Sequence, residues 1–326
     1  MFTVADARRY AVNLFAQSAN LASHTRSSWT LDADVLLQHF LQKPRAWLFA
    51  HDDADISEIQ PAFCTAAEKR CAGFPIAYIT GKKEFWGLPF LVTPDVLIPK
   101  PDTELMVEKS ISILKEKAAA SERPLYLLDP CTGSGCVAIS ILHTLEAENL
   151  RNICCVVVDI SPAALDIARL NAQRLLSPTL QTRLLILEGD MRALTDTAKC
   201  ASGFFSLHDD NRCHCTSGNS ARFDLIAANP PYVPSTLTQN LLKDGRNEPA
   251  LALDGGADGL DFIKILANNT PALLNDKGVL LSEIGDYHAK DACLLFKKAG
   301  FSDIRIYQDW AQQDRLIEGV YHDTKN

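Results

Sequence analysis

The spacing of hydrophobic residues changes twice along the chain, near residue 74 and near residue 100. From residue 1 to 73, apolar residues recur at helical spacing, for example in Val4–Phe15 and Val35–Leu41. The pair Gly73 and Pro75 is a typical end of a helix. Residues 74–100 instead carry short aromatic runs interrupted by Gly and Pro, which predict strands at 76–79 and within 84–92. The pattern therefore predicts a helical domain over 1–73 and a β-hairpin connector over 74–100.

Residues 101–326 are expected to form a second domain, and from Leu125 on the pattern alternates between apolar runs of strand length and amphipathic segments of helix length. The candidate strands are residues 125–129, 153–159, 183–188, 223–228, 278–284, 303–308 and 316–321. Alternating strands and helices are typical of a parallel sheet with helices on both faces. We therefore expect an α/β domain with a doubly wound, mostly parallel seven-stranded sheet.

One segment, residues 195–221, interrupts this alternation and is rich in Ser, Asp, Asn and Gly. It also holds Cys200, His208, Cys213, His214 and Cys215, whose side chains are potential zinc ligands. Their spacing matches none of the usual paired zinc-binding motifs. A disordered insert loop is therefore favoured over a metal site, and no metal is expected.

The composition narrows the range of targets. The net charge of −8 and the lack of a Lys/Arg run disfavour broad capture of nucleic acid, so a protein or small-molecule target fits better. Ten scattered cysteines, several of them inside apolar runs, are typical of reduced thiols in a cytosol. The first residues carry charges where a signal peptide has its apolar core, and no apolar stretch approaches the ~20 residues of a membrane span. We expect a cytoplasmic protein that contacts no membrane.

The four residues Asn229, Pro230, Pro231 and Tyr232 directly follow the apolar run 223–228. Proline ends a strand ladder because it lacks the N–H group, so these residues lie at the carboxyl end of the strand, where open α/β sheets bind ligands. The Asn side-chain oxygen and a nearby backbone carbonyl are two acceptors suited to the N–H groups of an –NH2 group, and Tyr232 adds a flat face. A plain Asn-Pro turn with a core tyrosine is the structural alternative.

A second candidate site begins where the strand at 125–129 runs into a glycine-rich turn and a helix. The turn comprises Cys131, Thr132, Gly133, Ser134 and Gly135, whose backbone N–H groups could meet a carboxylate. Asp159 ends the next strand, where an acid can accept both ribose hydroxyls; a helix-capping role is the alternative. The turn lacks the Gly-x-Gly-x-x-Gly pattern of dinucleotide sites, so an adenosyl amino acid fits better.

Two residues after the third predicted strand are further candidates for this adenosyl-binding site. Asp190 is placed to meet an adenine edge, and Met191 to pack on the adenine face. Plain core packing is nearly as good an explanation for Met191, since methionine fills gaps in many cores.

The Asn-Pro-Pro-Tyr segment resembles the (Asn/Asp)-Pro-Pro-(aromatic) motif of S-adenosylmethionine-dependent amino-methyltransferases. With further motifs, the chain resembles the protein-(glutamine-N5) methyltransferase family that modifies peptide-chain release factors. The further motifs are Pro75–Gly81, Glu84–Gly87, Ile98–Glu104, Glu248–Phe262 and Glu283–Gly285. The resemblance implies S-adenosyl-L-methionine as methyl donor and, as substrate, the glutamine of the Gly-Gly-Gln loop of bacterial class 1 release factors.

Three departures from the family pattern stand out. Pro130 and Cys131 occupy the glycine-rich turn, and Cys131 replaces a usual glycine. Lys100 replaces a usual Arg, which removes a possible bidentate contact. The segment 195–221 is also longer than the usual connection.

The resemblance implies roles for the tetrapeptide. The side-chain oxygen of Asn229 and the backbone oxygen of Pro230 would accept the two N–H bonds of the substrate glutamine, with Tyr232 on the amide plane. The helices of residues 1–73 would dock the protein substrate, and packing alone is the structural alternative for them. Three other functions stay open: a ribosomal-protein glutamine methyltransferase, an adenine-N6 methyltransferase of DNA or RNA, and a binding module without catalysis.

Overall fold

The computed structural model describes residues 1–21, 26–150, 152–206, 221–243 and 247–323. The chain separates into two compact units, one of residues 1–82 with 239–248 and one of residues 83–238 with 249–326. The division at residue 82 falls inside the segment expected to be a connector.

The first unit is helical, as the spacing of apolar residues predicts. Its helices are α1 Val4–Ala16, α2 Arg26–Leu41, α3 Arg45–Ala50, α4 Gln60–Cys71 and α5 Ile76–Thr80, with a 3-10 turn at Ala19–Leu21. Phe15, Leu36 and Phe63 are fully buried in its core. Asp34 is also fully buried, and its carboxylate accepts from Arg8 at 2.8 Å and Arg45 at 3.0 Å. A buried carboxylate needs such partners, because an unpaired charge in the core is strongly destabilising.

The prediction of a strand at residues 76–79 is wrong, because these residues belong to helix α5. Pro75 directly precedes the helix, and Gly81 ends it with φ at +69°. The hydroxyl of Thr80 donates to the carbonyl of Ile76, one turn back, at 3.0 Å. Helix-start and helix-end residues thus outweigh the β propensity of Tyr78 and Ile79.

A two-stranded hairpin follows, made of β1 Lys82–Phe85 and β2 Leu88–Leu91. Its turn residues Trp86 and Gly87 both have positive φ, the geometry that matches the twist of hairpin strands.

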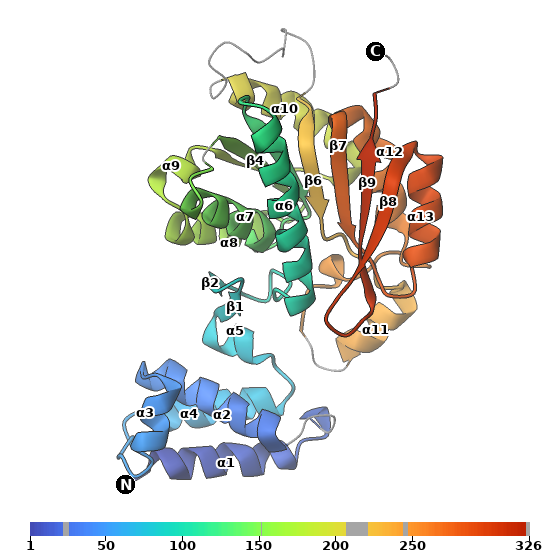
Figure 1. Cartoon of the computed structure of the whole chain (residues 1–326). Coiled ribbons are helices and arrows are strands. Elements are labelled where there is room, and N and C mark those ends of the chain that lie inside the picture. Colours follow the sequence, from blue (N-terminus) through green and yellow to red (C-terminus); the bar gives the residue numbers. More distant parts are fainter. Residues whose placement is uncertain (22–25, 151, 207–220, 244–246, 324–326) are drawn as a thin grey trace. The chain divides into compact units, whose positions relative to one another are not determined.

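The second unit holds a mostly parallel seven-stranded sheet in the order β5-β4-β3-β6-β7-β9-β8, which confirms the predicted doubly wound fold. The strands are β3 Leu125–Pro130, β4 Ile153–Asp159, β5 Leu184–Glu188, β6 Phe223–Ala228, β7 Leu274–Glu283, β8 Phe301–Gln308 and β9 Asp314–Tyr321. β9 pairs antiparallel with both β7 and β8, and Figure 1 shows it between these two strands. The order of connection reverses between β3 and β6, which creates a switch point at the carboxyl ends of these strands.

Helices cover both faces of this sheet (Figure 1). One face carries α6 Glu104–Ala120, α7 Cys136–Ala147 and α8 Pro162–Leu175, and the other α10 Leu194–Ser206, α12 Asp261–Asn269 and α13 Ala289–Lys298. The shorter helices α9 Pro178–Gln181 and α11 Ser235–Lys243 complete the list. Side chains of β3 alternate between the faces: Leu125 and Leu127 meet the first set, and Tyr126 and Leu128 the second. The sheet core is therefore apolar on both sides, and ligands are left to the strand ends.

The expectation of a disordered insert over 195–221 is wrong for its first part. Residues Leu194–Ser206 form α10, and its apolar side chains Leu194, Ala198, Ala201 and Phe205 are buried at helical spacing. This apolar stripe stabilises a helix despite the polar residues around it. Residues His208, Cys213, His214 and Cys215 lie outside the described residues.

Candidate active site at the carboxyl edge of the sheet

A cavity lies at the switch point and is lined by residues at the carboxyl ends of four strands of the sheet. Its polar lining includes Asp129 near the end of β3 and Thr132 after it, Asp159 at the end of β4, Asp190 after β5 and Asn229 after β6. The apolar lining includes Val96, Leu97, Ile160, Leu251 and Phe262. The predicted site residues that line it are Cys131, Thr132, Gly133, Ser134, Asp159, Asp190, Met191, Asn229 and Pro231. The structure thus brings both candidate sites to one cavity.

Three predicted site residues, Gly135, Pro230 and Tyr232, are not part of this lining. Gly135 precedes α7, and a β-carbon there would lie 2.8 Å from Ile139 and 3.4 Å from Ala168. The missing side chain of Gly135 therefore leaves room for side chains of α7 and α8. Pro230 is buried, and Tyr232 is partly buried and joins the polar network described below.

The turn after β3 has left-handed backbone at Cys131, Gly133 and Gly135, with φ of +66°, +55° and +79°. Glycine tolerates this conformation at little cost, whereas a residue with a β-carbon is strained by roughly 1 kcal/mol. Cys131 carries this strain, because it combines a β-carbon with a positive φ. At Gly133 a β-carbon would meet no atom within 4 Å, so this position opens onto the cavity.

Asp159 joins the ends of β3 and β4. Its Oδ2 accepts the backbone N–H of Gly133 at 2.8 Å, and its Oδ1 accepts that of Ser161 at 3.0 Å. Burial raises the pKa of Asp159. The N–H of Gly133, expected to meet a ligand carboxylate, is therefore used within the protein. A carboxylate can accept about four hydrogen bonds, so Asp159 retains acceptor capacity toward the cavity.

Asp129 lies beneath the turn and is buried. The hydroxyl of Thr132 donates to its Oδ2 at 2.8 Å. Burial raises the pKa of Asp129 to about 7. This carboxyl group holds the turn together from the core side.

Asp190 and Met191 follow β5, and both line the cavity. Asp190 accepts from the backbone and side chain of Arg192, at 2.8 and 3.0 Å, and the backbone bond is the main cause of its lowered pKa. Met191 is buried in the sheet core and also lines the cavity, with its sulfur 3.3 Å from that of Cys131. Core packing and cavity lining are therefore compatible for Met191.

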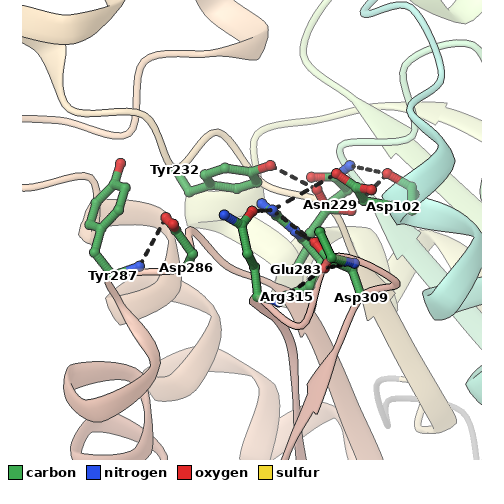
Figure 2. A network of polar contacts seen from close by, with 11 residues as sticks. Asp102, Asn229, Tyr232, Glu283, Asp286, Tyr287, Asp309 and Arg315 are labelled. Atoms are coloured by element: carbon green, nitrogen blue, oxygen red, sulfur yellow. Dashed lines mark hydrogen bonds and ion pairs between the residues drawn. The ribbon is translucent and has the colours of Figure 1, made fainter.

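Asn229 belongs to a network of buried polar groups (Figure 2). Its Nδ2 donates to the hydroxyl oxygen of Thr103 at 3.2 Å. Thr103 in turn donates to Oε2 of Glu283 at 2.7 Å, and the hydroxyl of Tyr232 donates to Oε1 of Glu283 at 2.8 Å. Thr103 and Glu283 are each only 2% exposed. The carboxylate at the end of β7 thus connects Thr103 and Tyr232, whose sequence motifs lie far apart.

A cationic group stands beside this carboxylate. Arg315 of β9 lies 3.1 Å from Asp309 and 3.8 Å from Asp102. Burial raises the pKa of Glu283, while the hydrogen bonds from Thr103 and Tyr232 and the charge of Arg315 oppose the rise. No role is predicted from the sequence for Thr103, Glu283 or Arg315, although Thr103 and Glu283 lie in motifs that carry the family resemblance.

The glycine-rich segment at 253–260 supports the backbone of the tetrapeptide. The N–H of Val233 donates to Leu253 at 2.9 Å, and the N–H of Gly255 donates to Val233 at 2.8 Å. A β-carbon at Gly255 would lie 2.7 Å from the Cα of Tyr232, and one at Gly259 would lie 2.4 Å from its carbonyl oxygen. Only glycine allows this close approach.

The described residues contain neither a candidate membrane span nor a candidate metal site. None of the helices is both long and apolar enough to cross a membrane. No group of three or more His, Cys, Asp or Glu side chains is arranged to hold a metal ion in this part of the chain.

Comparisons with known proteins agree along most of the chain. The family described as the PrmC N-terminal domain matches residues 14–81. The release factor glutamine methyltransferase of Moorella thermoacetica is 34% identical over 298 residues, which cover 88% of this chain and 89% of the relative. That of Geobacter sulfurreducens is 34% identical over 291 residues, 89% of this chain and 88% of the relative. A methyltransferase structure from Pyrococcus furiosus aligns with a TM-score of 0.45 and 16% identity, covering 74% of this chain and 92% of that one. The identity to curated relatives over nearly their whole length shows that this chain belongs to the release factor glutamine methyltransferase family.

Proposed function

We propose that the protein transfers a methyl group from S-adenosyl-L-methionine to the side-chain amide nitrogen of the glutamine in the Gly-Gly-Gln loop of class 1 release factors. The observation that carries this proposal is the common cavity of Asn229, Asp159 and the glycine turn. An amide-binding group and an adenosyl-binding group are both needed for such a reaction.

The residues of the cavity fit the methyl donor. Asp159 would accept the ribose hydroxyls with its remaining acceptor capacity, and Asp190 and Met191 would meet the adenine edge and face. Cys131, Thr132, Gly133 and Ser134 would border the amino acid part, where the missing side chain of Gly133 leaves room. Bound there, S-adenosyl-L-methionine supplies an electrophilic methyl group on a sulfonium.

The tetrapeptide would position the substrate amide. An amide nitrogen is a poor nucleophile because its lone pair is delocalised into the carbonyl, so its placement limits the rate. The Oδ1 atom of Asn229 and the backbone oxygen of Pro230 accept its two N–H bonds, Pro231 borders the pocket, and Tyr232 packs on the amide plane. Such positioning can lower a barrier by roughly 7–11 kcal/mol in favourable cases.

The same two acceptors stabilise the positive charge that develops on nitrogen during transfer. The methylated nitrogen then loses one proton, which it releases readily because a protonated amide is a strong acid. No general base is needed before the transfer.

We also propose that the helices of residues 1–73 dock the release factor. Phe49 is 60% exposed, and the guanidinium groups of Arg8 and Arg45 lie 5.2 and 5.4 Å from its ring. An exposed aromatic ring beside two cations is a typical feature of protein-binding surfaces.

The test is to incubate the protein with methyl-labelled S-adenosyl-L-methionine and purified release factors and to locate the label by mass spectrometry. The proposal predicts one methyl group on the Gly-Gly-Gln glutamine and none on a Gln→Ala loop variant. Ribosomal proteins and DNA serve as competing substrates. Labelling of either of these in place of the release factor would refute the proposal.

A further inference from the structure

We propose that Thr103 and Glu283 are positioning residues that fix which end of the Asn229 amide faces the substrate. The inference rests on the proposed function, because it assumes that Oδ1 of Asn229 is an acceptor for the substrate amide. Neither residue lies in the tetrapeptide, and Thr103 and Glu283 are 180 positions apart.

Glu283 is buried, and both of its carboxylate oxygens accept a hydrogen bond. An ionised carboxylate has no proton to donate, so both partners must be donors. The hydroxyl of Tyr232 donates to Oε1 of Glu283, and the hydroxyl of Thr103 donates to Oε2. Burial raises the pKa of Glu283, and the hydrogen bonds donated by Thr103 and Tyr232 and the charge of Arg315 oppose this rise. Glu283 therefore determines where the hydroxyl proton of Thr103 points.

The orientation of the Thr103 hydroxyl in turn determines the orientation of the Asn229 amide. A hydroxyl carries a single proton, and that of Thr103 is used by Glu283. Toward Asn229, 3.2 Å away, the hydroxyl oxygen can then only accept. The Nδ2 group of Asn229 must consequently face Thr103, which leaves Oδ1 for the cavity. If the amide were turned by half a rotation, two oxygens without a proton would face each other, and one hydrogen bond would be lost.

This orientation makes the site selective for a substrate group that donates a hydrogen bond. With Oδ1 toward the cavity, Asn229 accepts a hydrogen bond from the –NH2 group of a glutamine. In the opposite orientation it would present its own –NH2 group, which repels an –NH2 and suits a carboxylate. The buried pair thus favours glutamine over glutamate before any substrate arrives, and little reorganisation is needed during the reaction.

The test compares Thr103→Val, Thr103→Ser and the matched control Thr270→Val in steady-state methylation of a release factor. Valine keeps the shape of threonine and removes the hydroxyl, whereas serine keeps the hydroxyl. Thr270 is also fully buried, but its hydroxyl makes a local bond to Leu266 at 2.8 Å within its own helical segment. Thermal melting and calorimetric binding of S-adenosyl-L-methionine are measured on each variant.

Thr103→Val is expected to lower kcat about three- to tenfold, the loss that corresponds to one hydrogen bond of ordinary strength. Its affinity for the methyl donor should stay within twofold of wild type, as for Thr270→Val, and Thr103→Ser should restore most of the rate. Unchanged kcat in Thr103→Val would overturn the inference, as would an equal loss in Thr103→Ser.

A second variant distinguishes a positioning role of Thr103 from a merely structural one. Glu283→Gln keeps the shape of the side chain but can donate to Thr103, which releases the hydroxyl proton toward Asn229. If both residues act through one bond, the double variant Thr103→Val with Glu283→Gln should lose little more rate than the worse single variant. Fully additive losses would overturn the inference.

Asn229→Ala separates this inference from the proposed function. If Asn229→Ala retains the full rate, the proposed function fails at its first step. If it abolishes the reaction while both Thr103→Val and Glu283→Gln retain the wild-type rate, the positioning inference alone fails.

Discussion

Asp159 accepts the backbone N–H of Gly133 at 2.8 Å, so the acid that ends β4 holds the turn that follows β3. One carboxylate thereby shapes the turn and offers its remaining acceptor sites to the cavity. The ends of β3 and β4 are therefore joined by a side-chain hydrogen bond as well as by the backbone pairing of the two strands.

Replacing Asp159 by Asn should weaken binding of S-adenosyl-L-methionine by about tenfold or more, because hydrogen bonds to a charged group contribute roughly 1.5–3 kcal/mol. Calorimetric titration measures the change. The control is Glu188→Gln: Glu188 pairs with Asp159 in the strand register, but it is exposed and does not line the cavity. Equal effects of the two variants would contradict the assigned role of Asp159.

The two glycines of the turn should respond differently to alanine. Gly133→Ala is expected to strain the backbone by roughly 1 kcal/mol and to place a methyl group in the cavity, so donor affinity should fall more than stability. Gly135→Ala adds a contact 2.8 Å from Ile139, so it should lower the free energy of unfolding further.

Urea unfolding and donor titration on both variants check this contrast. The reverse order, with Gly133→Ala the less stable protein and Gly135→Ala the weaker binder, would show that the turn is not placed as described.

Because the pKa of Asp129 is raised, this residue should make the stability of the protein depend on pH. Its pKa rises from 3.8 to about 7 on burial, so between these values the folded protein keeps a proton that the unfolded chain has released. The associated stability is fully present below about pH 4 and is lost as the pH rises through 7.

Relative to an Asp129→Asn variant, the free energy of unfolding of the wild type should therefore fall by on the order of 2 kcal/mol between pH 5 and 7. Urea unfolding at a series of pH values gives the difference. Parallel curves for the two proteins would argue that Asp129 is ionised in the folded state throughout.

The docking proposal predicts an effect on substrate recognition alone. Phe49→Ala should raise KM for an intact release factor several-fold and leave kcat unchanged, because the ring belongs to the first unit and not to the cavity. A short peptide with the Gly-Gly-Gln loop should be methylated equally well by both proteins. An unchanged KM for the intact factor would contradict a docking role for this surface.

The sheet could be predicted from the sequence because its strands are continuous apolar runs, as in β4 Ile153–Asp159 and β6 Phe223–Ala228. Strands buried on both faces have this pattern. The helix at Ile76–Thr80 was mispredicted because Tyr78 and Ile79 have β propensity, while the residues that define its ends carry the decisive signal.

The site was only partly predictable for a different reason. Residues that follow strands, such as Asp159 and Asn229, could be placed at one edge of the sheet by topology alone. The contact between Thr103 and Glu283 depends on side-chain packing across 180 positions, and no local pattern contains it. The same holds for the N–H of Gly133, which the sequence assigned to a ligand and the structure assigns to Asp159.

Asn229, as the residue that would hold the substrate amide, is central to the proposed function. The direct measurement is single-turnover methylation of a release factor by Asn229→Ala, together with calorimetric binding of S-adenosyl-L-methionine. We predict a loss of rate of about a hundredfold or more, with donor affinity within threefold of wild type. A parallel loss of both, or a retained rate, would show that Asn229 only shapes the cavity, and would contradict the account.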